Sequence, residues 1–248
     1  MTEATPTEGL IFTIASLLQG LRHVAVGASS PIPGAAALLA KALAGREGRA
    51  PMRLSILGSR RDHAFTNGGV EIFDMIASGR IDAFFLGGGQ IDGQANINLV
   101  GTGPYPRSEV RWPGSFGSAY LYHLVPRVIL FREEHTRRVL VPRVDFVSAP
   151  GPRPDGVYRP GGPHALLTRL CLFDFDKARQ RFALRCVHPG HTLGEVRDAT
   201  GFDFDAVDDV PVTPQPDPAT LALIRGPVRE QIGRTYPRMA GCRMGSGL

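Results

Sequence analysis

The stretch LGGGQIDGQANIN, residues 86–98, gathers several groups that could bind a ligand. Its three consecutive glycines, Gly87, Gly88 and Gly89, allow a tight turn and let backbone N–H groups approach a ligand without interference from side chains. Gln90 and Asn96 then add amide groups that need hydrogen-bond partners. We interpret the stretch as part of a binding site. A glycine turn required only for packing is the alternative.

A second glycine-bearing stretch, PGSFGSA, contains Gly114, Ser115 and Gly117. A helix is expected to begin near Ser118, and backbone N–H groups at the start of a helix can bind an anion or an oxyanion. The pattern is short, so an ordinary junction between a loop and a helix explains it equally well. We expect the stretch to form the far wall of the same pocket.

Common catalytic and metal-binding motifs are missing from the sequence. It has no GxSxG, HExxH or GxxxxGK[ST] pattern. His188 and His191 lack a third ligand nearby, so we expect a structural loop and no metal site there. The segment Glu133-Glu134-His135 is interpreted as a solvated turn. Cys171 and Cys186 lie in apolar runs, which predicts buried, unreactive thiols.

The elements that position these residues follow from hydrophobic periodicity and from glycine and proline punctuation. We expect a sequence of strands separated by helix-length segments, followed by a hairpin and a helix whose capping box is formed by Thr192 and Glu195. The predicted helices are 8–20, 35–44, 68–78, 120–125, 192–200 and one after residue 217. The predicted strands are 23–26, 52–57, 81–86, 126–131, 139–147 and two within 167–187.

This alternation predicts an α/β fold: an open, mostly parallel sheet with helices on both faces and a β-hairpin appended near the carboxyl terminus. Ligands bind at the carboxyl ends of strands in such sheets, which is where the triple glycine follows its strand. We expect a single domain over residues 1–248, with a frayed tail from about residue 233.

Composition narrows the classes of function. The chain has 248 residues, of which 43% are apolar, and 28 basic against 23 acidic residues give a net charge of +5. The positive charge is scattered, so we expect no nucleic-acid partner. No apolar run is long enough to span a bilayer. The start, MTEATPTEGL, lacks the basic region of a secretory signal, so we expect a cytoplasmic protein.

Several stretches in order resemble the β subunits of family I CoA-transferases. They are VAVGASSPIPGAAALLAKAL, ASGRIDAFFLGGGQIDGQANIN, PGSFGSA and VILFREEHTRRVLVPRVDF. The later stretch FDFDKARQRFALRCVHPGHTLGEVRDATGFDF is similar to the glutaconate CoA-transferase branch, which includes ring-cleaving CoA-ester hydrolases. The resemblance implies a CoA-transferase β-type fold, an α-subunit partner in an α₂β₂ complex, and acyl-CoA and carboxylic acid substrates. Coenzyme A would be a substrate, with no permanently bound cofactor.

The resemblance also implies a catalytic glutamate just after the second strand, which attacks the thioester as a nucleophile. Here that segment is LSILGSRRDHAF, whose only acid is Asp62, and Glu71 follows further along. We keep both as weak catalytic candidates. Ser59 and Arg60 are candidate contacts for the CoA phosphates or a substrate carboxylate, although an exposed arginine that only covers the surface explains the pattern as well.

Three functions therefore stay open. The order of the motifs favours a CoA transferase. The missing glutamate and the carboxyl-terminal similarity favour a hydrolase that cleaves a carbon–carbon bond in a CoA ester, and the related hydrolases keep their working glutamate on the α chain. The absence of an evident catalytic set favours a non-catalytic binding or regulatory subunit. The sequence does not identify the acyl group.

Overall fold

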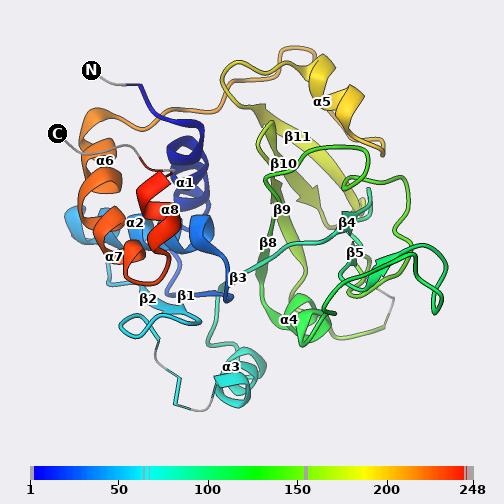
Figure 1. Cartoon of the computed structure of the whole chain (residues 1–248), viewed down its shortest axis with the longest axis horizontal. Helices are drawn as coiled ribbons and strands as arrows, with labels where there is room; N and C mark the ends of the chain where they lie inside the picture. The colour runs from blue at the N-terminus through cyan, green and yellow to red at the C-terminus, as the bar shows by residue number, and fades with distance from the viewer. Residues whose placement is uncertain (1–2, 64, 67, 154–155, 243, 245–248) are drawn as a thin grey trace. The chain divides into compact units, whose positions relative to one another are not determined.

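The computed structural model describes residues 3–63, 65–66, 68–153, 156–242 and 244 (Figure 1). The chain forms two compact units. The first contains Met1–Phe85 and Pro214–Leu248, and the second contains Leu86–Thr213. The single domain over residues 1–248 stays a prediction. Within the described residues, no helix is both long and apolar enough to cross a membrane.

A parallel three-stranded sheet forms the centre of the first unit. Strand β1 (His23–Val26) lies between β2 (Arg53–Ile56) and β3 (Ala83–Leu86), with Val24 opposite Leu54 on one side and Ala83 on the other. All four residues of β1 are buried. Short apolar runs without alternation are typical of strands covered on both faces, and the three strands confirm the parallel arrangement predicted for this part of the chain.

Three helices belong to the amino-terminal part of this unit. Helix α1 (Pro6–Leu17) begins with a capping box, in which Thr5 and Glu8 satisfy each other's backbone N–H groups. Helix α2 (Pro31–Arg46) packs against α1, β1 and β2. Its alanine-rich face is buried, and small side chains allow this close approach. Helix α3 (Gly68–Ala77) precedes β3. All three were predicted within a few residues.

The carboxyl-terminal segment contains more helices than the one we predicted. They are α6 (Pro218–Leu223), the π-helical turn η1 (Ile224–Val228), α7 (Arg229–Gly233) and α8 (Pro237–Cys242). Helix α8 lies within the tail that we expected to fray, and its Met239 and Ala240 are buried. The rest of that tail, 243 and 245–248, lies outside the described residues.

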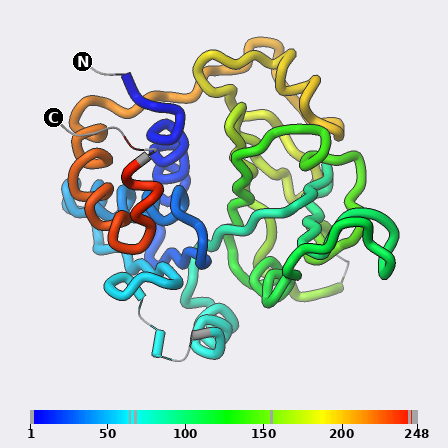
Figure 2. The backbone as a smooth tube through the Cα atoms, in the orientation of Figure 1, coloured from blue at the N-terminus to red at the C-terminus, as the bar shows by residue number. Residues whose placement is uncertain are grey.

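The two ends of the chain meet inside the first unit, as the blue and orange-to-red tubes show (Figure 2). Arg225 in η1 forms a two-pronged ion pair with Glu8 in α1, with Nε–Oε1 and Nη2–Oε2 separations of 2.8 and 2.9 Å. The Glu8 side chain is fully buried. A buried carboxylate requires such a partner, so this pair joins the carboxyl-terminal helices to the first helix.

The second unit contains a four-stranded sheet. Strand β8 (Arg127–Phe131) runs parallel to β9 (Pro163–Leu167), which continues into the antiparallel strands β10 (Cys171–Asp176) and β11 (Arg181–Val187). The β10–β11 hairpin confirms the predicted appendage. Strand β9 was not predicted because the sequence Pro-Gly-Gly-Pro, whose last proline begins the strand, indicates a loop.

Short ribbons and two helices complete the second unit. One ribbon pairs β4 (Gln90–Ile91) with β5 (Ile97–Asn98), and the other pairs β6 (Gly101–Thr102) with β7 (Val110–Arg111). The helices are α4 (Ser118–Leu124) and α5 (Leu193–Ala199), and α5 begins with the predicted capping box.

The strand predicted over residues 139–147 is wrong. Leu140 forms only an isolated bridge with Ile91, in which the Ile91 N–H donates to the Val139 carbonyl at 2.7 Å. Pro142 interrupts the ladder because it has no N–H to donate. The apolar side chains Val139, Val141 and Val144 are buried from a loop. The apolar residues of this run are therefore buried from a loop that pairs with Ile91 only through an isolated bridge.

Candidate functional site

The glycine turn between β3 and β4 is fixed by contacts with its own chain. A Cβ atom on Gly88 would lie 2.5 Å from the Gln90 carbonyl oxygen, and one on Gly89 would lie 2.2 Å from the ring of Trp112. A Cβ on Gly87 would lie 3.1 Å from the carbonyl oxygen of Phe131. Protein atoms thus occupy the side from which each Cβ would project. The approach of a ligand to the backbone of this turn stays a prediction.

Gln90 uses its side chain to hold neighbouring loops together. Its Oε1 accepts hydrogen bonds from Asn98 Nδ2 at 2.8 Å and from the Asp145 N–H at 2.9 Å. Its Nε2 donates to Asp145 Oδ2 at 3.1 Å, and that oxygen also accepts from the Gly103 N–H at 2.9 Å. Gln90 is 6% exposed. The chain thus supplies hydrogen-bond partners to both ends of the Gln90 amide, and a contact between Gln90 and a ligand stays a prediction.

The loop between β4 and β5 folds around Asp92. The buried carboxylate accepts from the N–H of Gln94 at 3.1 Å, from the N–H of Asn96 at 3.0 Å and from Asn96 Nδ2 at 3.0 Å. Asn96 Oδ1 accepts from the Gly151 N–H at 3.0 Å. These bonds fix the loop as one compact turn, with Asn96 as an organising residue.

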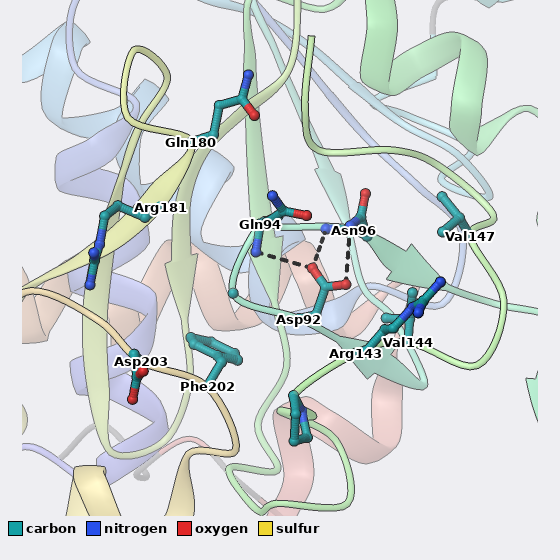
Figure 3. Close-up of a pocket in the computed structure, with 12 residues that line it drawn as sticks. Asp92, Gln94, Asn96, Arg143, Val144, Val147, Gln180, Arg181, Phe202 and Asp203 are labelled. Carbon is teal, nitrogen blue, oxygen red and sulfur yellow. Dashed lines mark hydrogen bonds between the residues drawn. The ribbon is translucent and has the colours of Figure 1, made fainter. Parts of the chain in front are cut away.

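This loop borders a cavity of the second unit with a volume of about 540 Å³ (Figure 3). Four separate segments contribute to it. The lining residues are Asp92, Gly93, Gln94, Asn96, Pro142, Arg143, Val144, Val147, Gln180, Arg181, Phe202 and Asp203. Of the predicted binding residues, only Asn96 is among them. The other segments were missed because none of them carries a recognisable binding motif and they lie far apart in the sequence.

The predicted far wall, Gly114 to Gly117, is an open loop before α4. Gly114 has φ +102°, and a Cβ there would meet no atom within 4 Å. Phe116 has φ 43° and is 89% exposed. The Ser115 carbonyl accepts from the Ser118 N–H at 2.8 Å. Gly117 caps α4 without a side-chain hydrogen bond. The loop offers space for a ligand, and its role as a pocket wall stays a prediction.

Ser59 and Arg60, in the loop after β2, belong to the first unit, whereas the glycine turn, Gln90 and Asn96 belong to the second. Ser59 is buried, and its Oγ accepts from the N–H groups of Arg61 and Asp62 at 3.3 and 3.1 Å. Arg60 is exposed. No described residue forms a hydrogen bond or an ion pair with the Arg60 guanidinium. Ser59 thus shapes the loop, while Arg60 is available to an anion.

Both weak catalytic candidates accept hydrogen bonds that organise the chain. The Asp62 carboxylate accepts from Gln231 Nε2, at 3.0 Å to Oδ1 and 2.9 Å to Oδ2. Glu71 in the first turn of α3 accepts from the Thr66 hydroxyl at 2.6 Å and from the Thr66 N–H. Neither contact indicates a poised nucleophile. Their assignment as catalytic acids stays a prediction.

We had expected His135 to lie in a solvated turn, and this prediction is wrong for its side chain. It is 1% exposed and its ring nitrogens contact the hydroxyls of Thr168 and Thr200 at 2.7 and 2.9 Å. His188 is also buried, with Thr213 Oγ1 at 2.8 Å and the Thr168 carbonyl at 3.0 Å. Burial lowers the pKa of each histidine to about 4. Both rings are therefore neutral parts of the core.

The two cysteines of the hairpin are buried, as predicted. Burial raises the pKa of both thiols, with the stronger effect at Cys171. A thiol held in its protonated form is a poor nucleophile. Among the described residues, no group of three or more His, Cys, Asp or Glu side chains could hold a metal ion.

The chain matches known proteins along most of its length. The model of the family described as Coenzyme A transferase matches residues 30–199. The B-type subunit of the glutaconate CoA-transferase of Acidaminococcus fermentans is 32% identical over 148 residues, covering 57% of this chain and 54% of that protein. The IpdB subunit of the cholesterol ring-cleaving hydrolase of Rhodococcus jostii is 32% identical over 161 residues, covering 62% of each chain. The alignments thus span less than two thirds of these relatives.

The fold has solved counterparts. The crystal structure of Rhodococcus jostii IpdAB superposes with a TM-score of 0.77 at 26% identity, and covers 91% of this chain and 94% of the other. This similarity confirms the predicted α/β architecture. The family match extends over more than half of the sequence, and the curated relatives are B-type subunits. The chain therefore belongs to the coenzyme A transferase family, among its β subunits.

Proposed function

We propose that the chain is the β subunit of a heteromeric CoA-transferase-family enzyme that acts on acyl-CoA thioesters. The match to the family over residues 30–199 carries this proposal. The relatives named as B-type subunits, and the structure named IpdAB, support a matching α chain as the partner. The working unit would be α₂β₂, with the thioester bound between the α and β chains. Coenzyme A would be a substrate, with no permanently bound cofactor, in a cytoplasmic enzyme.

For the CoA ester, we propose contacts from both predicted glycine loops and from the loop after β2. Arg60 supports this because its guanidinium has no hydrogen-bond or ion-pair partner among the described residues and arginine binds phosphates through paired hydrogen bonds. The open space around Gly114 supports a ligand contact there. The proposed residues are Ser59, Arg60, Gly87, Gly88, Gly89, Gln90, Asn96, Gly114, Ser115 and Gly117.

A second candidate reaction is hydrolysis of a carbon–carbon bond in a CoA ester. One observation favours it: the only acid in residues 57–66 is Asp62, and its carboxylate accepts hydrogen bonds from Gln231. A transferase of this family would need a nucleophilic carboxylate to form an acyl anhydride and then a CoA thioester. The relative described as a ring-cleaving hydrolase supports this alternative.

Co-expression with a candidate α chain tests the assembly. Light scattering should give the mass of an α₂β₂ complex. In a structure of that complex, an obligate interface should bury more than about 2,000 Å² in total. A β chain that stays monomeric beside the α chain, and is fully active alone, would contradict the proposal.

Mass spectrometry of the intact chains then separates the two reactions. After incubation with acyl-CoA, a transferase that used this chain would carry a CoA-sized adduct on the β chain. Treatment with borohydride or hydroxylamine would remove the adduct because both react with thioesters. A hydrolase would form product with water and leave the β chain at its original mass.

A further inference from the structure

The β6–β7 ribbon is attached at its base to the glycine turn. The ring of Trp112, the residue after β7, lies against the backbone of Gly89, where a Cβ atom would be 2.2 Å from that ring. The Trp112 N–H donates to the Val100 carbonyl at 2.9 Å. The Gly103 N–H donates to Asp145 Oδ2, also at 2.9 Å. The base of the ribbon therefore has a fixed position beside the turn that we propose for CoA binding.

The outer part of the ribbon is open to solvent. Both residues of β7, Val110 and Arg111, are exposed, and their side chains point to opposite faces because they are neighbours in a strand. Tyr105, in the connection between β6 and β7, is 55% exposed. A two-stranded ribbon is at best marginally stable in water unless something packs against it. A strand that is exposed on both faces therefore indicates a surface for another chain.

Aromatic and cationic side chains gather at this outer part. The rings of Tyr105 and Phe146 lie in contact, with centroids 4.9 Å apart. The guanidinium carbon of Arg111 lies 5.7 Å from the centroid of the Tyr105 ring, which is a cation–π distance. No described residue forms an ion pair with Arg111. We call Tyr105, Arg111 and Phe146 the Tyr105 cluster. Tyrosine, phenylalanine and arginine are enriched at protein interfaces, where tyrosine and arginine often supply much of the binding energy.

The position of the Tyr105 cluster favours the matching α chain as its partner. In the proposed function, the thioester binds between the α and β chains and contacts the glycine turn. The α chain must then cover the surface next to this turn, and Trp112 holds the ribbon there. The exposed ring of Tyr105 requires an apolar surface on the partner. Arg111 requires a carboxylate, because covering an arginine without an acceptor is costly.

We propose that the outer part of the β6–β7 ribbon, together with the Tyr105 cluster, docks on the α chain. The facing surface of the α chain is apolar and carries a carboxylate opposite Arg111. This inference rests on the proposed function and extends it by naming the surface of this chain that its partner covers. Because Trp112 connects the ribbon to Gly89, docking also fixes the position of the glycine turn relative to the α chain.

Dissociation of the purified complex tests the proposal. This chain is co-expressed with its α chain, and mass photometry follows the complex through a dilution series. Tyr105→Ala and Arg111→Glu should each raise the concentration at which α and β separate by about tenfold or more. Tyr105→Phe keeps the ring and should behave like the unsubstituted chain. Two matched controls in the second unit are Tyr158→Ala, which shortens an exposed tyrosine, and Arg197→Glu, which reverses the charge of an exposed arginine in α5. Both controls should leave that concentration unchanged.

The outcomes separate this proposal from the proposed function. If the unsubstituted chains form no complex, the proposed function itself fails. If the complex forms and every variant dissociates at the same concentration, only the docking surface is overturned. Release of intact αβ pairs from an α₂β₂ complex by Tyr105→Ala would place the cluster between two copies of this chain, and would also overturn the proposal. If Tyr105→Ala melts at a lower temperature, Arg111→Glu on the exposed strand β7 decides.

Discussion

The side-chain amide of Gln231 donates to both carboxylate oxygens of Asp62, at 3.0 and 2.9 Å. This contact fastens the loop after β2 to helix α7 and gives Asp62 a structural role. We expect Asp62→Asn to keep turnover of the assembled enzyme within about twofold and to lower stability by about 1 kcal/mol. Kinetics and thermal melting measure the two effects. A loss of turnover by about a hundredfold at unchanged stability would identify Asp62 as catalytic.

The two buried histidines predict an acid-sensitive fold. Their folded-state pKa of about 4 lies below the ordinary value of 6.5. Below about pH 6.5 these histidines therefore bind protons in the unfolded chain but not in the folded one. Their contribution to the free energy of unfolding is fully present above pH 6.5 and is lost as the pH falls toward 4. Between pH 7 and pH 5, each histidine should cost about 2 kcal/mol of unfolding free energy.

Urea denaturation at pH 7 and pH 5 measures this loss. In His135→Gln and His188→Gln, part of the dependence on pH should disappear, because the replaced ring no longer titrates. His191→Gln is the control, since this half-buried ring pairs with Glu195 at 3.5 Å. An unchanged pH dependence in both core variants would show that these rings do not cause the acid sensitivity.

Two glycines in different surroundings, Gly89 in the glycine turn and Gly45 in helix α2, should respond in opposite ways to substitution by alanine. Gly89→Ala would push a methyl group into the ring of Trp112, so it should destabilise the protein by about 2 kcal/mol or more. Gly45→Ala, inside helix α2, meets no atom within 4 Å and should stabilise by up to about 1 kcal/mol. Thermal melting compares the two. If Gly89→Ala melted at the same temperature as the unsubstituted protein, the Trp112 ring would be able to move away from the methyl group with little loss of stability.

Arg60 provides a test of the CoA site that leaves the core intact. Arg60→Gln removes a guanidinium with no described partner, so stability should not change while acyl-CoA binding to the complex weakens about tenfold. Arg107→Gln, an exposed arginine in the second unit, controls for the loss of one charge. Titration calorimetry with acyl-CoA measures both. If the Arg60→Gln complex bound acyl-CoA as tightly as the unsubstituted complex, Arg60 would be an exposed residue with no part in binding.

The sequence predicted the main elements because their signals are local. The apolar run of β1, the capping boxes at Thr5–Glu8 and Thr192–Glu195, and the alanine-rich α2 each depend on neighbouring residues. The capping box at Thr192 was predicted, whereas that at Thr5 was not. The apolar run at 139–147 was mistaken for a strand, because its buried valines belong to a loop.

The site was less predictable because its geometry depends on distant segments. Gln90 meets Asp145, and Asp62 meets Gln231, across long stretches of sequence. The cavity around Asp92 likewise combines four segments, whose arginines carry no motif. Polar residues in a glycine-rich loop indicated a need for hydrogen-bond partners. Only the structure shows that the chain itself provides many of them.

The most direct test of the proposed function is thioester turnover by separate and combined chains. The β chain, the α chain and their complex are each incubated with a panel of acyl-CoA esters, and loss of the substrate is followed by chromatography. We predict turnover by the complex and none by either chain alone. Equal turnover by the isolated β chain, or no reaction of the complex with any ester, would contradict the assignment as a β subunit that acts on acyl-CoA.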